Sequence, residues 1–170
     1  MNSIERRDDI VKLLLDSSSP IKGTDIAEKY SVTRQVIVRD IAILRAKGVN
    51  IMATPDGYIV NRNDGKVKTI IAVNHKESEM FEEMSTVIKY GGIIEDVIVE
   101  HPLYGEIKGA LMVKNLNELN KFINKYNNQK ARLLSVLTNG VHLHTIAADT
   151  SEDIESIISE LRAKNFIVSD

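Results

Sequence analysis

The segment from Thr24 to Gly48 limits the possible folds of this chain more than any other part of the sequence. It has the pattern of two short helices that pack across a tight turn. Ala27 supplies the small residue needed where two such helices touch, and Ser31 lies at the turn between them. An apolar stripe along the second helix would hold it against the first, and it consists of Val32, Ile37, Ile41 and Leu44. The segment therefore predicts a helix–turn–helix.

The residues on either side of this motif complete a winged helix. Apolar residues at helical spacing predict a first helix over Ile4–Leu15. Thr24 is expected to be the N-cap of the second helix and Thr33 the N-cap of the third, which ends near Lys47. The turn residues Thr54-Pro55-Asp56-Gly57 then predict a hairpin between strands at 49–53 and 58–60. We expect this winged helix–turn–helix domain to span residues 1–62.

The solvent-facing side of the third predicted helix carries side chains suited to DNA. Arginine and glutamine make paired hydrogen bonds with guanine and adenine edges in the major groove. A helix N-terminus and a threonine at its cap can bind a backbone phosphate. The candidate DNA-binding residues are Thr33, Arg34, Gln35, Val38 and Arg39. The expected partner is double-stranded operator DNA, and the alternative is a helical bundle whose arginines are only solvated.

The run Thr33-Arg-Gln-x-Ile-x-Arg-Asp-Ile-x-x-Leu-Arg-x-x-Gly48 resembles the winged helix of biotin-repressor-type and sugar-operon regulators. Some domains of this fold serve as protein-docking modules instead of DNA readers. The charge distribution agrees in sign with DNA binding. Residues 1–62 hold ten Lys/Arg and eight Asp/Glu, whereas residues 63–170 hold twelve and sixteen. The positive excess thus falls on the part expected to meet DNA.

A polar stretch, Asn61–Lys66, separates this region from one in which strands and helices alternate. That order predicts an α+β fold, here a two-layer domain with a mainly antiparallel sheet over residues 66–170. Predicted strands lie at 67–73, 93–100, 105–113, 132–137, 141–147 and 166–168. Predicted helices lie at 76–90, 116–127 and 151–164, the last with Ser151 as its N-cap. The strands at 132–137 and 141–147 are expected to form a hairpin about Asn139-Gly140.

Composition narrows the classes of protein that remain. Hydrophobic residues make up 43% of the 170 residues, which predicts a packed globular chain. Cysteine is absent, so disulfides and thiolate metal sites are excluded. No apolar run approaches the roughly 18 residues of a membrane span, and the acidic N-terminal helix lacks the pattern of a signal peptide. A protein of the reducing cytoplasm, without a membrane partner, is expected.

The four histidines are the residues best suited to a small-molecule or metal site. His142 and His144 alternate along a predicted strand and therefore point to the same face, where two imidazoles make half of a divalent metal site. The other face, formed by Val141, Leu143 and Thr145, is expected to pack inward. The alternative is an exposed pair of histidines that binds nothing.

Two more side chains can complete such a site. His75 ends the first strand of this region, and Glu83 lies two turns into the helix that follows, on a face that can return toward the strand end. Three imidazoles and one carboxylate suit a divalent transition metal such as zinc, nickel, iron or manganese, with one ion per subunit. The donor types alone do not choose among these ions.

From about Val67 to its end, the chain resembles the three-histidine domain of niacin-responsive transcriptional repressors. The matching runs are Val73-Asn-His75, Asp96-Val-Ile-Val-Glu-His-Pro-Leu-Tyr-Gly-Glu-Ile-Lys-Gly109 and Asn139-Gly-Val-His-Leu-His-Thr145. The resemblance implies a homodimeric repressor of NAD-biosynthesis and niacin-uptake genes, with nicotinic acid as co-repressor. It also implies that the metal ligands are His75, Glu83, His142 and His144.

His101 and Tyr104 lie in a run whose proline and glycine fit a reversal between two strands. A carboxylate ligand such as nicotinate needs a cation, a metal or N–H donors, so these two residues are candidates for effector binding. The alternative for His101 is a turn histidine with a structural hydrogen bond.

Two other functions fit some of the same residues. A histidine-bound metal can activate water, with Glu100 or Glu106 as a base, which would make the chain a metal-dependent hydrolase fused to a winged helix. The second alternative function is a transcription regulator that senses the metal ion itself. The sequence has no nucleophile elbow, P-loop, dinucleotide fingerprint or zincin motif, so we expect a regulator and not an enzyme.

Overall fold

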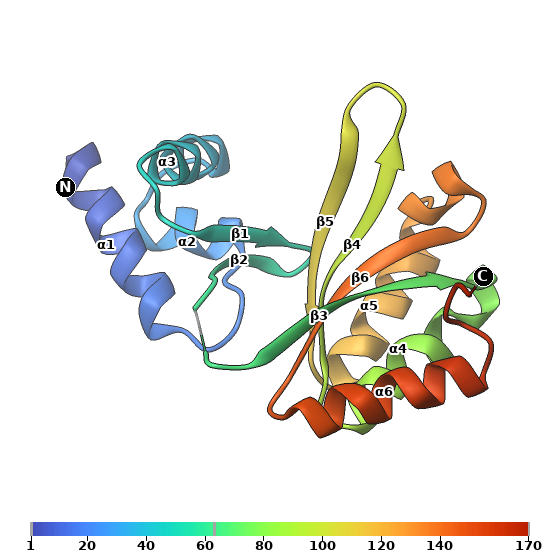
Figure 1. Cartoon of the computed structure of the whole chain (residues 1–170). Helices are drawn as coiled ribbons and strands as arrows, with labels where there is room; N and C mark the ends of the chain where they lie inside the picture. Colours follow the sequence, from blue (N-terminus) through green and yellow to red (C-terminus); the bar gives the residue numbers. More distant parts are fainter. Residues whose placement is uncertain (1, 63, 170) are drawn as a thin grey trace. The chain divides into compact units, whose positions relative to one another are not determined.

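The structure, a computed structural model, describes residues 2–62 and 64–169, and the chain forms two compact units, Met1–Asn63 and Asp64–Asp170 (Figure 1). Asn63, which falls in the predicted linker, lies outside the described residues. Each unit combines helices with an antiparallel sheet and has its own apolar core. The predicted α+β class, with a helix–turn–helix domain first, is confirmed.

The N-terminal unit contains three helices followed by a hairpin. Its elements are α1 (Ser3–Asp16), α2 (Gly23–Lys29), α3 (Arg34–Ala46), β1 (Ile51–Thr54) and β2 (Gly57–Val60). The predicted apolar stripe faces the core, because Ile37, Ile41 and Leu44 of α3 are buried against α1 and α2. Burial of this stripe fixes which side of α3 remains in solvent.

The turn between α2 and α3 depends on Ser31, which adopts a left-handed backbone with φ of 53°. Glycine is the usual residue in this conformation, but here the amide of Val32 bonds to the carbonyl of Ala27 and closes the turn. Thr33 is the N-cap of α3 as predicted, and its hydroxyl accepts from the amide of Val36. The N-cap prediction for Thr24 is wrong: α2 begins at Gly23, and Lys22 precedes it without a side-chain cap.

The hairpin is held to the helices through a third backbone segment. Ile21 and Tyr58 exchange both backbone hydrogen bonds, at 2.9 and 2.8 Å. Gly57 makes this approach possible, since a Cβ there would lie 2.2 Å from the carbonyl oxygen of Ile21. The hairpin therefore has a fixed place beside the helices of its own unit, as a wing requires.

A buried carboxylate also ties α1 to α3. Asp40 is 2% exposed, and its two oxygens bond to Arg6 Nε at 2.7 Å and Arg7 Nη1 at 3.2 Å. A buried charge is tolerated only where it is paired in this way. Asp40 lies in α3 next to Arg39, so Arg6 and Arg7 of α1 help to set the orientation of α3.

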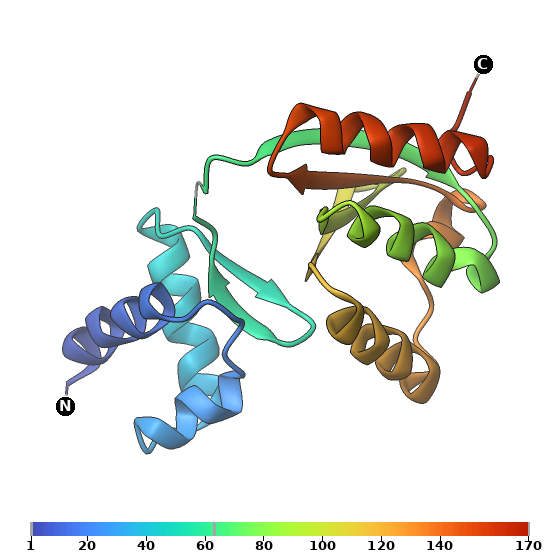
Figure 2. The same cartoon turned by 90° about the horizontal axis from the view of Figure 1, so that it is seen from below.

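The C-terminal unit is a four-stranded antiparallel sheet in the order β3-β6-β4-β5. Figure 2 views it from the side on which α4, α5 and α6 cover the sheet. The strands are β3 (Val67–Asn74), β4 (Ile93–His101), β5 (Gly105–Val113) and β6 (Val141–Ala148). The helices are the 3₁₀ turn η1 (Glu77–Glu79), α4 (Met80–Lys89), α5 (Leu116–Gln129), the 3₁₀ turn η2 (Leu134–Thr138) and α6 (Ser151–Ala163).

The strand predicted at 132–137 is wrong. The segment from Leu134 to Thr138 is the 3₁₀ turn η2, and β6 pairs with β3 on one side and β4 on the other. Both edges of β6 are thus taken, which leaves none for a hairpin partner. Asn139 and Gly140 do reverse the chain, with φ of 53° and 95°, but they join η2 to β6.

Three smaller expectations also differ from the structure. The N-cap of α6 is Thr150, not Ser151, because the Thr150 hydroxyl accepts from the amide of Asp153. The helix predicted from Lys76 begins with the 3₁₀ turn η1. At 166–168 there is a single bridge between Ile167 and Val73 instead of a strand. No helix within 2–62 or 64–169 is long and apolar enough to cross a membrane.

Candidate functional site

His142 and His144 lie on the face of β6 that is covered by helices. They are 5% and 4% exposed, in line with Ile146 and Ala148 of the core. The expectation that the neighbouring residues pack inward is wrong, since Val141 is 40% exposed on the opposite face. The histidines are therefore inner residues of the unit, and the prediction that they share one face is correct.

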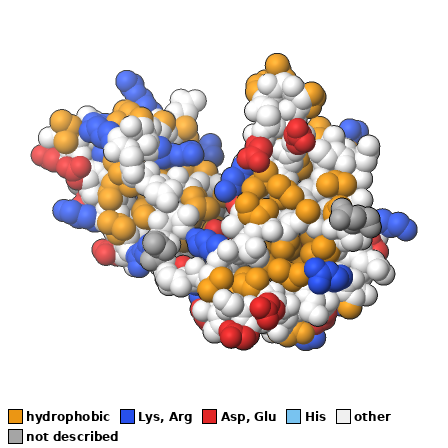
Figure 3. All heavy atoms as spheres, in the orientation of Figure 1, with side chains coloured by type: hydrophobic (Ala, Val, Ile, Leu, Met, Phe, Trp, Pro, Cys, Tyr) orange, Lys and Arg blue, Asp and Glu red, His pale blue; other side chains and the backbone are white. Residues whose placement is uncertain are grey.

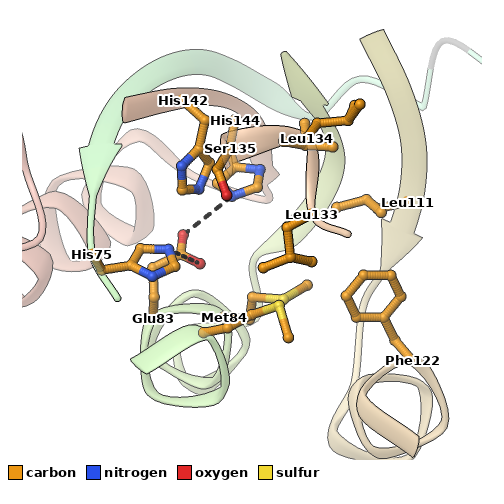
Figure 4. A pocket seen from close by; sticks show the side chains of 12 residues that line it. His75, Glu83, Met84, Leu111, Phe122, Leu133, Leu134, Ser135, His142 and His144 are labelled. Carbon is orange, nitrogen blue, oxygen red and sulfur yellow. Dashed lines mark ion pairs between the residues drawn. The ribbon is translucent and has the colours of Figure 1, made fainter. Parts of the chain in front are cut away.

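His75 and Glu83 meet these two histidines in one cluster (Figure 4). His75 follows the end of β3, and Glu83 lies in the first turn of α4 with no exposed surface. The Glu83 carboxylate is 3.6 Å from His75 Nε2 and 3.5 Å from His144 Nε2. Donor atoms of His75, Glu83 and His142 lie within 4.8 Å of one another, so the structure brings all four predicted ligands together.

Backbone carbonyls fix the orientation of all three rings. His75 Nδ1 lies 2.9 Å from the carbonyl oxygen of Lys76, His142 Nδ1 2.8 Å from that of Gly140, and His144 Nδ1 2.5 Å from that of Asp96. A carbonyl oxygen only accepts, so each Nδ1 carries the proton. In a neutral ring Nε2 is then left as an acceptor with a lone pair.

The centre of the cluster holds buried polar atoms without hydrogen-bond partners. Among the described residues, the buried side-chain polar atoms without a hydrogen-bond partner are His75 Nε2 and both carboxylate oxygens of Glu83. Buried polar atoms in native proteins nearly always have partners, and a carboxylate is the costliest group to leave without one. These side chains could therefore hold a metal ion.

Burial and neighbouring charges shift the pKa values of three cluster residues. Burial alone raises the pKa of Glu83, but the neighbouring imidazoles, His144 first, outweigh it and lower that pKa. Burial lowers the pKa of His75, whereas its contacts with Glu83 and the Lys76 carbonyl raise it, and the net change is upward. Burial, together with repulsion from His144, lowers the pKa of His142 to about 4. His142 is thus neutral at pH 7.

An apolar cavity opens directly beside the cluster. Figure 4 shows its walls, with Leu111, Phe122 and Leu133 facing the histidines across the space. The remaining walls come from α4, β4 and the segment before β6, and they consist of Met80, Met84, Val97, Leu134 and Ser135. The cavity therefore pairs a polar, charged end with an apolar body, which is the usual composition of a small-molecule site.

His101 and Tyr104 lie elsewhere, at the turn between β4 and β5. The tip of this hairpin carries hydrophobic side chains (Figure 3), and Leu103 and Tyr104 are 75% and 72% exposed. His101 Nδ1 accepts from the amides of Leu103 and Tyr104 at 3.1 and 3.2 Å. Neither His101 nor Tyr104 lines the cavity beside the histidine cluster. The observed hydrogen bonds match the alternative of a turn histidine.

The candidate DNA-binding residues form one exposed surface of the N-terminal unit. Figure 3 shows Lys and Arg side chains along the surface over α3. Thr33 precedes the helix, and Arg34, Gln35, Val38 and Arg39 all project into solvent from the side opposite the core. The apolar Val38 is 43% exposed there. This is the face that a recognition helix would present to the major groove.

Sequence reasoning missed the residues that shape the cavity. Leu134 and Ser135 were expected in a strand, and the three carbonyls that orient the histidines have no sequence signal, because every residue has a carbonyl. Of the three carbonyls, only that of Gly140 could have been suggested by the sequence, because Gly140 belongs to a turn pattern two residues before His142.

Known protein families and relatives match nearly the whole chain. Residues 68–170 match the 3H domain family, and residues 6–59 match an HTH domain family. The chain is 46% identical over 98% of its length to the probable transcription repressor NiaR of Thermotoga maritima, covering 95% of that protein. It is 37% identical over 97% of its length to the transcription repressor NadR of Bacillus subtilis, covering 94% of it.

The pKa of His142 predicts a pH-dependent loss of stability in the metal-free protein. Between pH 6.5 and about 4 the unfolded chain holds a proton on His142 that the folded chain lacks. The free energy of unfolding should therefore decrease as the pH is lowered through this window, by about 3 kcal/mol in all. A His142→Asn variant lacks this contribution. Urea unfolding of both proteins in chelator, from pH 7 to 4, measures the difference.

A His101→Asn variant is the control, because His101 lies outside the cluster at the β4–β5 turn. As the pH falls, the free energy of unfolding of the wild type should decrease more than that of His142→Asn. It should decrease by the same amount as that of His101→Asn. A constant difference between the wild type and His142→Asn at every pH would contradict the burial argument.

Proposed function

We infer that nicotinic acid is the co-repressor of this chain, which belongs to the family of 3H-domain transcription repressors. The chain is therefore a DNA-binding repressor and not the hydrolase considered from its sequence. We propose that its target genes are those for NAD biosynthesis and niacin uptake. We also propose that the protein acts in the cytoplasm. The single observation that supports the effector most strongly is the buried cluster of three histidines and Glu83 beside an apolar cavity.

We propose that His75, Glu83, His142 and His144 hold one divalent transition metal per subunit. Two ligand atoms that are each about 2.1 Å from a tetrahedral ion lie about 3.4 Å apart. The separations of 3.5 and 3.6 Å between Glu83 oxygens and the Nε2 atoms are close to that value. The unpaired carboxylate oxygens of Glu83 and the Nε2 atoms of the histidines are the ligand atoms that such an ion needs. Zinc, nickel, iron and manganese all accept this donor set.

The cavity beside this cluster fits the chemistry of nicotinate. The ligand has a carboxylate at one end and a flat aromatic ring, so it needs a positive group and an apolar slot. A bound metal supplies a positive charge at the end formed by the histidines. Phe122, Leu111 and Leu133 supply apolar walls for the ring. We therefore place the effector in this cavity, although His101 and Tyr104 were the residues first expected to bind it.

Repression then depends on a difference in affinity between two states of the protein. An effector shifts an equilibrium only if it binds the DNA-competent state better than the other state. We propose that the chain acts as a homodimer, because two identical helix–turn–helix units read a pseudo-palindromic operator with a spacing set by the dimer. Nicotinate binding in the C-terminal unit would favour the dimer state that matches this spacing.

Removal of two histidines should abolish the metal. We expect the His142→Ala/His144→Ala double variant to contain no bound divalent metal after reloading and desalting, because half of the ligands are lost. Elemental analysis by mass spectrometry gives the metal content per chain. His101→Ala, at the exposed β4–β5 turn, is the matched control and should keep one ion per chain. Full metal content in the double variant would refute the assignment of the ligands.

Nicotinate should strengthen binding to the operator. A gel shift on the DNA upstream of the protein's own gene, with and without nicotinate, measures this directly. We expect at least a tenfold gain in affinity, about 1.4 kcal/mol, and loss of that gain after chelation of the metal. If operator affinity is unchanged at saturating nicotinate, the co-repressor assignment fails. If metal alone gives the full gain, the protein is a metal sensor instead.

Arg34→Ala should weaken binding to the operator by roughly 1–3 kcal/mol and affect random DNA much less. The reason is that Arg34 begins α3 on its exposed side, where a recognition helix contacts bases. Arg45→Ala, at the exposed last turn of the same helix, is the matched control. Fluorescence anisotropy with both DNAs measures the affinities. An equal loss on both DNAs would make Arg34 a phosphate contact.

A further inference from the structure

The pairing of β4 with β6 is interrupted beside the histidine cluster. Ile94 pairs with Ile146, but the next pair is Ile98 with Leu143. Three residues of β4 therefore lie opposite two residues of β6, which is the pattern of a β-bulge. The pairing of β4 with β5 shifts at the same place, between Ile94 and Asp96. Bulges often change the direction of a backbone group next to a functional site.

Asp96 sits in this bulge and replaces the missing ladder bonds with its own atoms. Its carbonyl oxygen accepts from His144 Nδ1 at 2.5 Å. One oxygen of its carboxylate accepts from the amide of Thr145 at 2.8 Å. The other oxygen lies 2.9 Å from Lys108 Nζ on the neighbouring strand. Asp96 is 1% exposed, so all three contacts hold a buried group.

These contacts link the side chain of Asp96 to the orientation of one predicted metal ligand. The carboxylate fastens the bulge of β4 to β6 at Thr145, the residue after His144. This attachment keeps the Asp96 carbonyl beside the His144 ring, which fixes the proton on Nδ1 and leaves Nε2 facing Glu83. Without it, the amide of Thr145 loses its acceptor and the carbonyl of Asp96 is free to move.

We propose that Asp96 is a positioning residue that prepares His144 to bind the metal through its bonds to His144, Thr145 and Lys108. The proposal rests on the metal site described above. Partners that orient a ligating histidine typically change metal affinity by 10–100-fold when they are removed. Lys108 contributes by neutralising the buried carboxylate, since an uncompensated charge would favour a different backbone position.

A neighbouring residue on the same strand separates positioning from simple stabilisation. Glu95 is 8% exposed and pairs with Lys68 Nζ at 2.7 Å, so it too is a buried carboxylate bound to a lysine, here one of β3, which lies on the far side of β6. It does not line the cavity beside the histidine cluster. Glu95→Ala therefore removes a buried ion pair from the same bulge while leaving the Asp96 bonds to His144, Thr145 and Lys108 in place.

The experiment compares Asp96→Ala, Asp96→Asn and Glu95→Ala with the wild type in full-length protein. Titration with Co²⁺, followed by its visible absorption bands, gives both the affinity and the coordination geometry. We expect Asp96→Ala to weaken Co²⁺ binding by 10–100-fold and to change the spectrum. Asp96→Asn keeps an acceptor for the Thr145 amide and should stay within about threefold of the wild type. Glu95→Ala should bind like the wild type even if its melting temperature falls.

A second measurement uses the metal-free protein and so does not depend on the metal site. Nitrogen-15 NMR of the histidine rings reports which ring nitrogen carries the proton. We expect His144 to be protonated on Nδ1 in the wild type, Asp96→Asn and Glu95→Ala, and to become a mixture in Asp96→Ala. The Lys108→Met variant, which keeps the carboxylate, gives the same test with a smaller effect if Asp96→Ala does not fold.

The outcomes distinguish this inference from the proposed metal site. If the wild type binds no Co²⁺, the metal site fails, and the NMR measurement alone decides the role of Asp96. If the wild type binds and Asp96→Ala matches Glu95→Ala in affinity, spectrum and ring protonation, Asp96 is only structural and the inference is overturned. It is also overturned if Asp96→Asn behaves like Asp96→Ala.

Discussion

Glu83 is a carboxylate with no exposed surface, and the inner part of the C-terminal unit is arranged to compensate it. A buried carboxylate is strongly unfavourable unless positive groups or donors surround it. β6 contributes two imidazoles to this task and the end of β3 contributes a third. Since all three rings place Nδ1 beside a backbone carbonyl, only their Nε2 atoms are left to face the carboxylate, and the neighbouring imidazoles lower the pKa of Glu83. Among the described residues, both Glu83 oxygens and His75 Nε2 still lack a hydrogen-bond partner.

The N-terminal unit solves the same problem in the opposite way. Asp40 is also a buried carboxylate, but two arginines of α1 bond to it directly. Arginine is always charged, so this site is complete within the chain and needs nothing else. At Glu83 the neighbouring groups are histidines, and burial keeps at least His142 neutral at pH 7 by lowering its pKa to about 4. The contrast supports a structural role for Asp40 and a cation-binding role for Glu83.

Local patterns in the sequence predicted most of the fold, because caps, turns and helical periodicity act over a few residues. The order of the helices and the wing were correct, and Thr33 caps α3 as expected. The segment around Leu134 failed because its structure depends on β3 and β4, which occupy both edges of β6. The prediction that the face with Val141 packs inward failed for a similar reason. Alternation along a strand defines two faces, and only the helix layer decides which of them is buried.

The four predicted ligands were brought together, yet the sequence gives no sign of how they are oriented. Orientation comes from backbone carbonyls and from the bulge at Asp96, and both arise from pairing between distant strands. The cavity has the same origin, since its walls come from α4, α5, β5 and the segment before β6. A small molecule bound there would contact most layers of the unit at once. Its binding energy would therefore be available to favour one packing of these layers over another, which is what control of a separate DNA-binding unit requires.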